Sequence, residues 1–257
     1  MSWVARLFEK APSIEERLAE ALVAWNAGDY GVALDLWAPL AQAGVARAQS
    51  NMGAAFLDGR GVERDLGKAA AWLRRAAEQG DAGGQRNLAL CYYEGWGVPQ
   101  DQTEAALWYE KAAEQDDPDA QDMLSWMKLV GGGCPQDYLG ARHWAEKAAA
   151  HGRAGAMARL GDIHHNALGV ERDPVLAAHW WARAAHLGQV EAQAMLGAAY
   201  LAGKGVGRDA VEALHWLLRA EAGGAGELAT GFLHEAQAHT KPSQRAEAAR
   251  RASEPLS

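Results

Sequence analysis

The pair Ser125 and Lys128 matches the Ser-x-x-Lys motif of penicillin-recognising enzymes, in which the serine is the nucleophile. The companion motifs of those enzymes, Lys-Thr-Gly and Ser-Asp-Asn, do not accompany the pair. A hydrolase or penicillin-binding enzyme that uses Ser125 and Lys128 is therefore kept as an alternative only. We predict that the chain is not an enzyme and that it has no catalytic residue.

Histidines are the second group that could do chemistry. His234 and His239 are five residues apart, whereas a zinc-binding helix places two histidines four apart on one face. His143, His179 and His215 recur at one position of successive helices, each directly before a tryptophan. Packed helices lie about 8–10 Å apart, which would allow a ladder of rings for a metal or a pH response. A row of polar helix residues is the commoner explanation, so we predict no metal and no cofactor.

Composition limits the class of protein. The chain has 257 residues, a formal net charge of −8 and two cysteines. The acidic balance argues against a general nucleic-acid binder and mildly favours basic partners. No segment approaches the roughly 20 apolar residues of a membrane helix, and Met1–Lys10 is too short in its apolar stretch for a signal peptide. We expect a cytoplasmic protein without membrane insertion or a disulfide framework; its oligomeric state is left open.

The elements that must position any site form an internal repeat. Five tryptophans recur every 36 residues, and an aspartate precedes each of them by seven residues. A fixed period of this length indicates a solenoid of helix pairs. The tryptophans are Trp72, Trp108, Trp144, Trp180 and Trp216, and the aspartates are Asp65, Asp101, Asp137, Asp173 and Asp209. We expect each indole to pack in the core, between the second helix of its own pair and the first helix of the next.

Each period is predicted to contain a helix A, a glycine turn, a helix B and a second turn. The aspartate caps helix B because its side chain accepts the free N–H groups of the first helical turn. Glu104 and Glu212 lie three residues after their aspartates and predict capping boxes. Small residues at one position of helix A should let the two helices approach closely. They are Gly53, Ala89, Ser125, Gly161 and Gly197.

The repeat defines the predicted domain organisation, which is one solenoid over residues 1–257. Residues 1–47 form a divergent N-terminal repeat, in which Ile14 to Ala27 is helix A and Asp29 to Gly44 is helix B. Residues 48–223 form five regular repeats. Residues 224–257 form a C-terminal cap and tail, with helices at Leu228 to His239 and Pro242 to Arg251. End units are expected to be atypical because one of their faces meets water.

The strings Ala-Gln-x-x-Leu-Gly, Gly-x-Gly-Val-x-x-Asp and Trp-x-x-x-Ala-Ala-x-x-Gly are clearest in Gln49 to Gly80 and Gln193 to Ala220. They resemble the Sel-one-like repeat of the tetratricopeptide superfamily, over about residues 14 to 223. The resemblance implies an all-α, right-handed superhelical solenoid of about six 36-residue repeats plus a C-terminal capping helix pair. It also implies an adaptor or scaffold whose A helices line a concave groove, although fold alone does not give function.

By this resemblance, part of each helix A should face the groove. Trp126 occupies a position that is Ala54, Leu90, Asp162 and Ala198 in the other repeats, and a core position would not vary in this way. Aromatic and arginine side chains are the usual anchors of interfaces. The predicted groove residues are Arg86, Leu90, Tyr93, Glu94, Asp122, Trp126, Leu129, Asp162 and His165. Arg86 and Asp122 share one position in adjacent repeats and could pair with each other instead.

The sequence thus favours a bacterial adaptor or scaffold that binds a protein or peptide segment in its groove. A narrower form of this hypothesis is an immunity or chaperone-like partner in a bacterial assembly. A passive structural spacer is the remaining alternative. The partner and its pathway cannot be read from the sequence.

Overall fold

The computed structural model describes residues 12–256, so Met1–Lys10, which was predicted not to be a signal peptide, lies outside the described residues. The described part contains fourteen helices and no strand. They form seven A–B pairs, which confirms the prediction of six repeats and a closing pair. The pairs are α2 (Ile14–Asn26) with α3 (Tyr30–Gln42), α4 (Ala46–Asp58) with α5 (Leu66–Glu78), α6 (Ala82–Glu94) with α7 (Gln102–Glu114), α8 (Pro118–Val130) with α9 (Tyr138–Ala150), α10 (Ala154–Asn166) with α11 (Pro174–His186), α12 (Val190–Ala202) with α13 (Ala210–Ala222), and α14 (Gly226–Ala238) with α15 (Pro242–Ser253).

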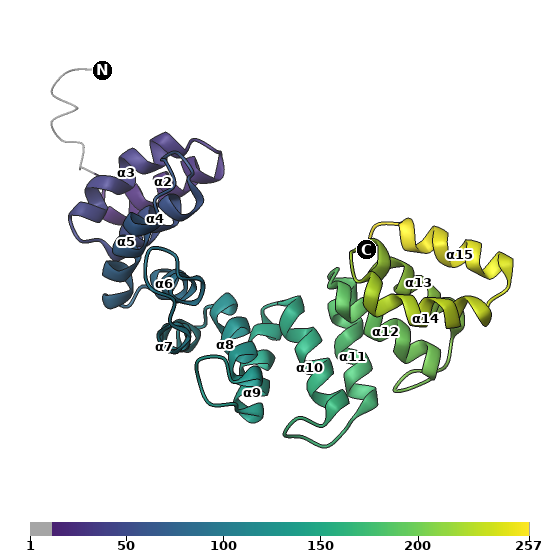
Figure 1. Cartoon of the computed structure of the whole chain (residues 1–257). Coiled ribbons are helices and arrows are strands. Elements are labelled where there is room, and N and C mark those ends of the chain that lie inside the picture. The colour runs from purple at the N-terminus through teal and green to yellow at the C-terminus, as the bar shows by residue number, and fades with distance from the viewer. Residues whose placement is uncertain (1–11, 257) are drawn as a thin grey trace. The chain divides into compact units, whose positions relative to one another are not determined.

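The chain divides into two compact units. Unit 1 ends at Asp117 and contains α2 to α7, and unit 2 begins at Pro118 and contains α8 to α15. Within each unit every helix A lies beside its own helix B and is followed by the next pair (Figure 1). None of the described helices is long and apolar enough to cross a bilayer.

The aspartate caps form as predicted. All five aspartate side chains accept backbone N–H groups of helix B, as in Asp101, which accepts from Thr103 and Glu104 at 2.9 and 3.1 Å. The predicted capping boxes are wrong, because the N–H of the capping aspartate is already used. Asp101 donates it to the carbonyl of Tyr92 in helix A, at 2.9 Å. Glu212 instead pairs with Arg251 of α15.

The Gly-x-Gly turn is where one repeat touches the repeat before it. The second glycine of the turn has a positive φ, +69° at Gly97 and +79° at Gly205. A Cβ atom on Gly97 would lie 2.0 Å from the carbonyl oxygen of Leu66, and one on Gly205 would lie 1.9 Å from that of Pro174. These turns therefore press backbone against the start of the preceding helix B, which only glycine permits.

A buried glutamine links successive helix pairs. The amides of Gln49, Gln85 and Gln193 donate to the carbonyls of Ala41, Ala77 and Ala185, at 3.1, 3.3 and 3.1 Å. Each of these carbonyls lies near the end of the preceding helix B and also accepts the N–H of the glycine three residues on, as Ala77 does from Gly80 at 3.0 Å. The bond from the glutamine amide is the structural role of the Ala-Gln string in the repeat.

The tryptophan column differs from the expectation in two respects. Trp216 alone is buried, at 5 % exposure, whereas the other four rings are half-buried. The rings also pack toward the preceding repeat: Trp72 lies against a cluster formed by α2, α3 and α4, and Trp108 against one formed by α4, α5 and α6. The outer faces of the half-buried rings are covered by the cation three residues on, as where Lys111 lies 3.9 Å from the centre of Trp108.

The small position of helix A receives the residue that follows each tryptophan. A Cβ atom on Gly53 would lie 2.5 Å from Leu73, and one on Gly197 would lie 2.7 Å from Leu217. At these two repeats the expectation of close helix contact is confirmed, and the contact is made by side-chain insertion. These insertions set the distance between helices A and B and so position the exposed faces of the A helices.

Candidate functional site

The A helices of unit 2 line a groove of about 520 Å³. Trp126 and Leu129 come from α8, Ala158 and Asp162 from α10, and Met195 from α12. A second hollow of about 190 Å³ shares Trp181 and Met195 with the first and adds His165 and Phe232. We call the two together the unit 2 groove, defined by Trp126, Leu129, Asp162, His165, Trp181, Met195, Leu228 and Phe232.

Trp181 is a central lining residue of this groove and was missed by the sequence analysis. Its ring is 3 % exposed and inserts against Gly161, where a Cβ atom would lie 2.3 Å from the indole. The indole Nε1 donates to Asp162 at 3.0 Å, and the ring of His165 lies 5.1 Å from that of Trp181. The sequence does contain a signal for this insertion, because the largest residue at this position of helix B lies opposite a glycine of helix A.

The groove carries more negative than positive charge. Arg159 on its wall is neutralised by Asp122, with Nη1 and Oδ1 2.6 Å apart. Asp162 and Glu191 have no ion-pair partner among the described residues, and one further cation, Lys204, lines the second hollow. Burial raises the pKa of Asp162, and the hydrogen bond from Trp181 and the charge of Arg159 partly oppose this. Burial lowers the pKa of His165, and the charges of Arg172 and Lys204 lower it further.

Four of the nine predicted groove residues meet in the unit 2 groove: Trp126, Leu129, Asp162 and His165. All four are half-buried, so each ring or chain presents part of its surface. Asp122 lies behind the wall and holds Arg159. Met195, Leu228 and Phe232 complete the apolar lining. They were not predicted, because the repeats have no fixed residue type at the positions that they occupy.

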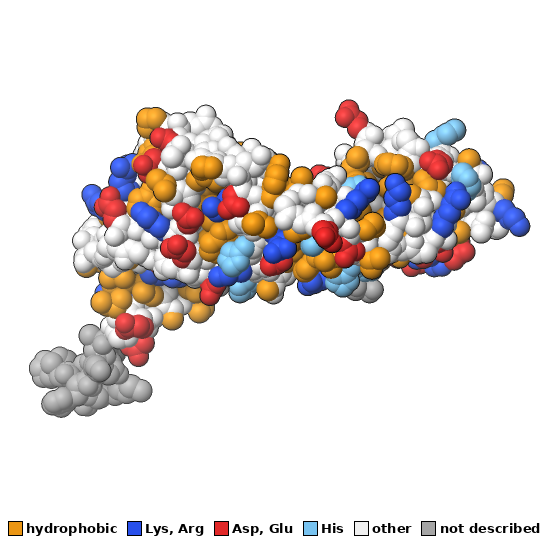
Figure 2. Space-filling model, turned by 90° about the horizontal axis from the view of Figure 1, so that it is seen from below, with side chains coloured by type: hydrophobic (Ala, Val, Ile, Leu, Met, Phe, Trp, Pro, Cys, Tyr) orange, Lys and Arg blue, Asp and Glu red, His pale blue; other side chains and the backbone are white. Residues whose placement is uncertain are grey.

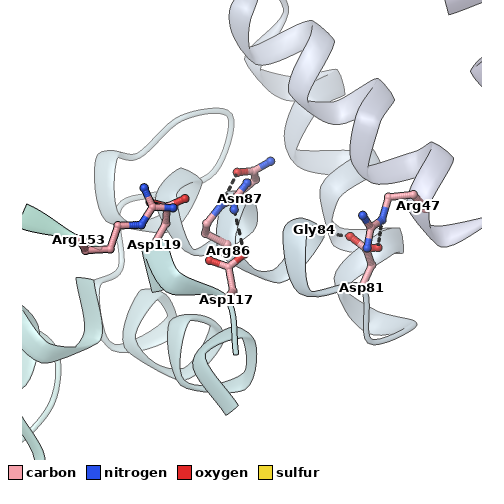
Figure 3. A network of polar contacts seen from close by, with 8 residues as sticks. All are labelled: Arg47, Asp81, Gly84, Arg86, Asn87, Asp117, Asp119 and Arg153. Carbon is pink, nitrogen blue, oxygen red and sulfur yellow. Dashed lines mark hydrogen bonds and ion pairs between the residues drawn. The ribbon is translucent and has the colours of Figure 1, made fainter. Parts of the chain in front are cut away.

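The other four predicted residues belong to α6 in unit 1. Leu90 and Tyr93 are half-buried, and Glu94 is exposed. Arg86 donates from Nη1 to Asp117 at 2.8 Å and from Nε to Asn87 at 3.3 Å (Figure 3). Within its own unit Arg86 pairs with Asp117, and within unit 2 Asp122 pairs with Arg159.

Arginine–aspartate pairs also join the starts of successive A helices. In unit 1, Arg47 of α4 bonds Asp81, the residue that caps α6, with Nε and Oδ2 2.7 Å apart (Figure 3). In unit 2, Arg153 before α10 pairs with Asp119 of α8 at 3.0 Å. These contacts fix neighbouring A helices to one another and so hold the surface that they share.

The candidate chemistry of Ser125 has no support in this geometry. Its side chain is fully buried, and its hydroxyl donates to the carbonyl of Ala141 at 2.8 Å. It occupies the small position of helix A, where it packs. The structure gives this serine a packing role.

The histidine column also forms no ladder. His143, His179 and His215 each place their ring edge-on to the tryptophan that follows, with centroids 5.1, 5.7 and 4.8 Å apart. Over residues 12–256, no group of three or more His, Cys, Asp or Glu side chains is arranged to hold a metal ion. Cys91 is buried and Cys134 is half-buried.

The face drawn in Figure 2 carries basic, acidic and hydrophobic side chains in mixture, with no continuous basic stripe. Such a stripe is the usual footprint of a nucleic-acid binder.

A family model described as Sel1 repeat matches five stretches of the chain: residues 46–81, 82–117, 118–152, 154–189 and 190–224. The solved structure of a Sel1 repeat protein from Oxalobacter formigenes matches with a TM-score of 0.80 and 30% sequence identity. That match covers 94% of this chain and 98% of the other. No curated protein matches the chain.

Two further solved structures are more distant. The protective antigen c5321 of uropathogenic Escherichia coli, which displays an SLR fold, has a TM-score of 0.43 at 25% identity over 93% of this chain and 68% of its own. The immunity protein Pa5087 from Pseudomonas aeruginosa has a TM-score of 0.45 at 20% identity over 82% and 84%. Of the three, the Oxalobacter protein alone combines a high TM-score with coverage of nearly both chains.

Proposed function

The chain belongs to the Sel1 repeat family, and we propose that it is a non-enzymatic adaptor or scaffold that holds a protein or peptide segment in the unit 2 groove. Sel1 repeats generally mediate contacts between proteins. The proposal for this chain is more specific, because it assigns the contact to named residues of α8, α10 and α12.

The observation that carries the proposal is the aromatic lining of the groove. Trp126, Trp181 and Met195 line one hollow of about 520 Å³ together with Leu129 and Leu228. Tryptophan is enriched among residues that dominate interface energetics, because it buries a large apolar area and loses few rotamers. A hollow of this size accepts one large side chain of a partner and leaves room for its main chain to pass.

Charge supports a segment that carries a basic residue beside its apolar anchor. Asp162 and Glu191 lie on the first hollow, where the positive charge of Arg159 is already neutralised by Asp122, while the remaining cation, Lys204, lines the second hollow. A lysine or arginine of the partner would bring a cation to Asp162, whose pKa is raised by burial. Binding should then release a proton and weaken as the pH falls through that raised pKa.

We also propose a cytoplasmic setting in a bacterium for this adaptor. An immunity or chaperone-like role toward one partner of a bacterial assembly is the narrower form of the same hypothesis. Both remain proposals that rest on the family rather than on a residue of the groove.

Selection from a random peptide library tests the groove directly. The whole chain is immobilised, and enriched peptides are synthesised and titrated against the wild type and against the double variant Trp126→Ala/Met195→Ala. We expect enrichment of peptides with a large apolar residue next to a lysine or arginine, and a loss of affinity of about tenfold or more in the double variant.

Val175→Ala is the matched control, because Val175 is exposed on α11 and does not line the groove. This variant should bind the same peptides as the wild type. Equal binding by the double variant and the control would overturn the groove assignment. Failure to enrich any peptide would favour the passive spacer.

A further inference from the structure

A second hollow in unit 2, on different residues from the groove, lies between α11, α12, α13 and α15. It has a volume of about 420 Å³ and is called the C-terminal pocket here. Leu196, Trp216 and Leu256 form apolar parts of its wall. Its polar lining residues are His186, Tyr200, Glu212, His215, Arg219, Arg251 and Glu254.

Two buried nitrogen atoms of this lining have no hydrogen-bond partner in the described part of the chain. They are Nδ1 of His215, a residue only 6 % exposed, and Nε of Arg219. A buried polar atom without a partner costs about 1–3 kcal/mol, so most such atoms in folded proteins are satisfied. Protein atoms enclose both nitrogens, so a ligand in the pocket can reach these two residues only through the other ring nitrogen of His215 and the terminal nitrogens of Arg219.

The charges around the pocket leave one cation uncompensated. Glu212 pairs with Arg251 at 2.6 Å, and Glu254 pairs with Arg250. The guanidinium of Arg219 donates only to main-chain carbonyls, those of Arg251 at 3.2 Å and of Glu254. No acidic side chain among the described residues pairs with Arg219, so a ligand with one negative charge would balance the site.

We propose that the C-terminal pocket binds a carboxylate ligand that carries an apolar group, with the carboxylate at Arg219 and His215 and the apolar group against Trp216, Leu196 and Leu256. Arginine presents N–H donors in a planar fork that matches a carboxylate. The apolar wall accounts for the rest of the ligand. This site is independent of the unit 2 groove and of the function proposed for it.

Binding at this site should take up a proton. Burial lowers the pKa of His215, and the neighbouring Arg251 and Arg219 lower it further, while Glu212 and a hydrogen bond to the main chain of Ala248 raise it. His186, Tyr200 and Glu254 are the other titratable groups at the pocket. A bound carboxylate adds a negative charge beside His215 and raises its pKa, so affinity increases as the pH falls.

Unit 1 provides a matched control for this site. A hollow of about 430 Å³, called the unit 1 pocket here, is lined by Leu88, Tyr92, Glu104 and Trp108, which lie three repeats before Leu196, Tyr200, Glu212 and Trp216. At the positions that match His215 and Arg219 this unit has Leu107 and Lys111. The unit 1 pocket therefore occupies the same place in the repeat as the C-terminal pocket but lacks the pair that His215 and Arg219 form there.

The first test is calorimetric titration of the whole chain with N-acetyl-L-leucine and with its uncharged amide. The acid should bind, the amide should not, and Arg219→Gln should weaken binding of the acid about tenfold or more, because a charge-assisted hydrogen bond is lost. Lys111→Gln should leave binding unchanged. Arg219→Lys keeps the charge but lacks the fork, so its affinity for the acid should lie between those of Lys111→Gln and Arg219→Gln. It replaces Arg219→Gln in the test if that variant proves unstable.

The second test isolates His215. His215→Leu copies the residue at the matched position of α7, so it should fold and should lose the increase in affinity between about pH 8 and about pH 6. A tetrapeptide that ends in leucine, with a free or an amidated C-terminus, distinguishes a chain end from a small free acid as the source of the carboxylate. Equal binding of acid and amide, or equal affinity of Arg219→Gln and Lys111→Gln, would overturn the proposal.

Discussion

The unit 1 pocket and the C-terminal pocket occupy the same place in the repeat, three periods apart, but their neighbours make them different. In unit 1, Arg74 donates from Nη2 to the hydroxyl of Tyr92 at 2.8 Å, and Lys111 covers the ring of Trp108. In unit 2, the position of Arg74 is Ala182, and α15 with the residues after it closes over Trp216. The repeat thus provides the shape, and the end of the array changes its chemistry.

The cation after each tryptophan shows the same contrast. Lys111 and Lys147 lie over the rings of Trp108 and Trp144, three residues before them, and shield them from water. Arg219 has the same spacing from Trp216, but its guanidinium reaches the main chain beyond α15. The ring that loses its cation is the one that is buried, because the C-terminal helix has taken over the covering role.

The largest expected effect separates these two rings. Trp216→Ala should lower the free energy of unfolding by about 3–5 kcal/mol, because it removes a buried ring of the unit 2 core. Trp108→Ala should cost less, about 1–2 kcal/mol, since its ring is half-buried and its outer face meets only a lysine.

Calorimetric melting of both variants beside the wild type measures the difference, and it also reveals whether the units unfold together. Equal losses of unfolding free energy in the two variants would show that burial by α15 adds no stability at the tryptophan position.

A smaller effect tests the glutamine link, which is present in unit 1 and missing from one repeat of unit 2. Gln85 donates to Ala77 and accepts from Gln115, whereas its position two repeats later is Met157. Gln85→Met should cost about 1–3 kcal/mol, because it removes two hydrogen bonds of a buried side chain, each of which contributes about 0.5–1.5 kcal/mol.

Gln136→Met is the control for this change. The amide of Gln136 also donates to a main-chain carbonyl, that of Leu129 at 2.8 Å, but this bond is exposed. Water replaces it there, so urea denaturation should show a loss below about 1 kcal/mol. A similar loss in both variants would mean that the buried position of Gln85 is not what matters.

The sequence predicted the local structure well because local structure depends on neighbours in the chain. The aspartate caps depend on three or four adjacent residues, and the first and last helix pairs begin and end within about two residues of their predicted bounds. The direction of the tryptophan packing was not predictable in the same way. The 36-residue spacing is identical whether a ring packs toward the preceding repeat or toward the next one.

The candidate sites show the same limit more strongly. Trp126 was found because its position varies against a regular background, and this signal needs only the repeat alignment. Trp181 required knowledge that it inserts against Gly161, and Arg219 required the position of α15, a helix that does not follow the repeat pattern. Predictions from periodicity therefore fail first at the end of the array, where the partner of each residue is no longer one period away.

The smallest expected effect lies at the end of helix A, where one repeat of unit 2 differs from its neighbours and from unit 1 by one methyl group. Gly95 in unit 1 and Ala167 in unit 2 both adopt the left-handed conformation, with φ of +74° and +58°. A residue with a Cβ atom pays about 1–2 kcal/mol there, and glycine gives back part of this through its greater freedom when unfolded. Ala167→Gly should therefore stabilise the chain by about 0.5–1 kcal/mol, and Gly95→Ala should destabilise it by a similar amount. Melting temperatures of the two variants would shift in opposite directions, and a shift of the same sign in both would show that the left-handed turn does not limit the stability of either repeat.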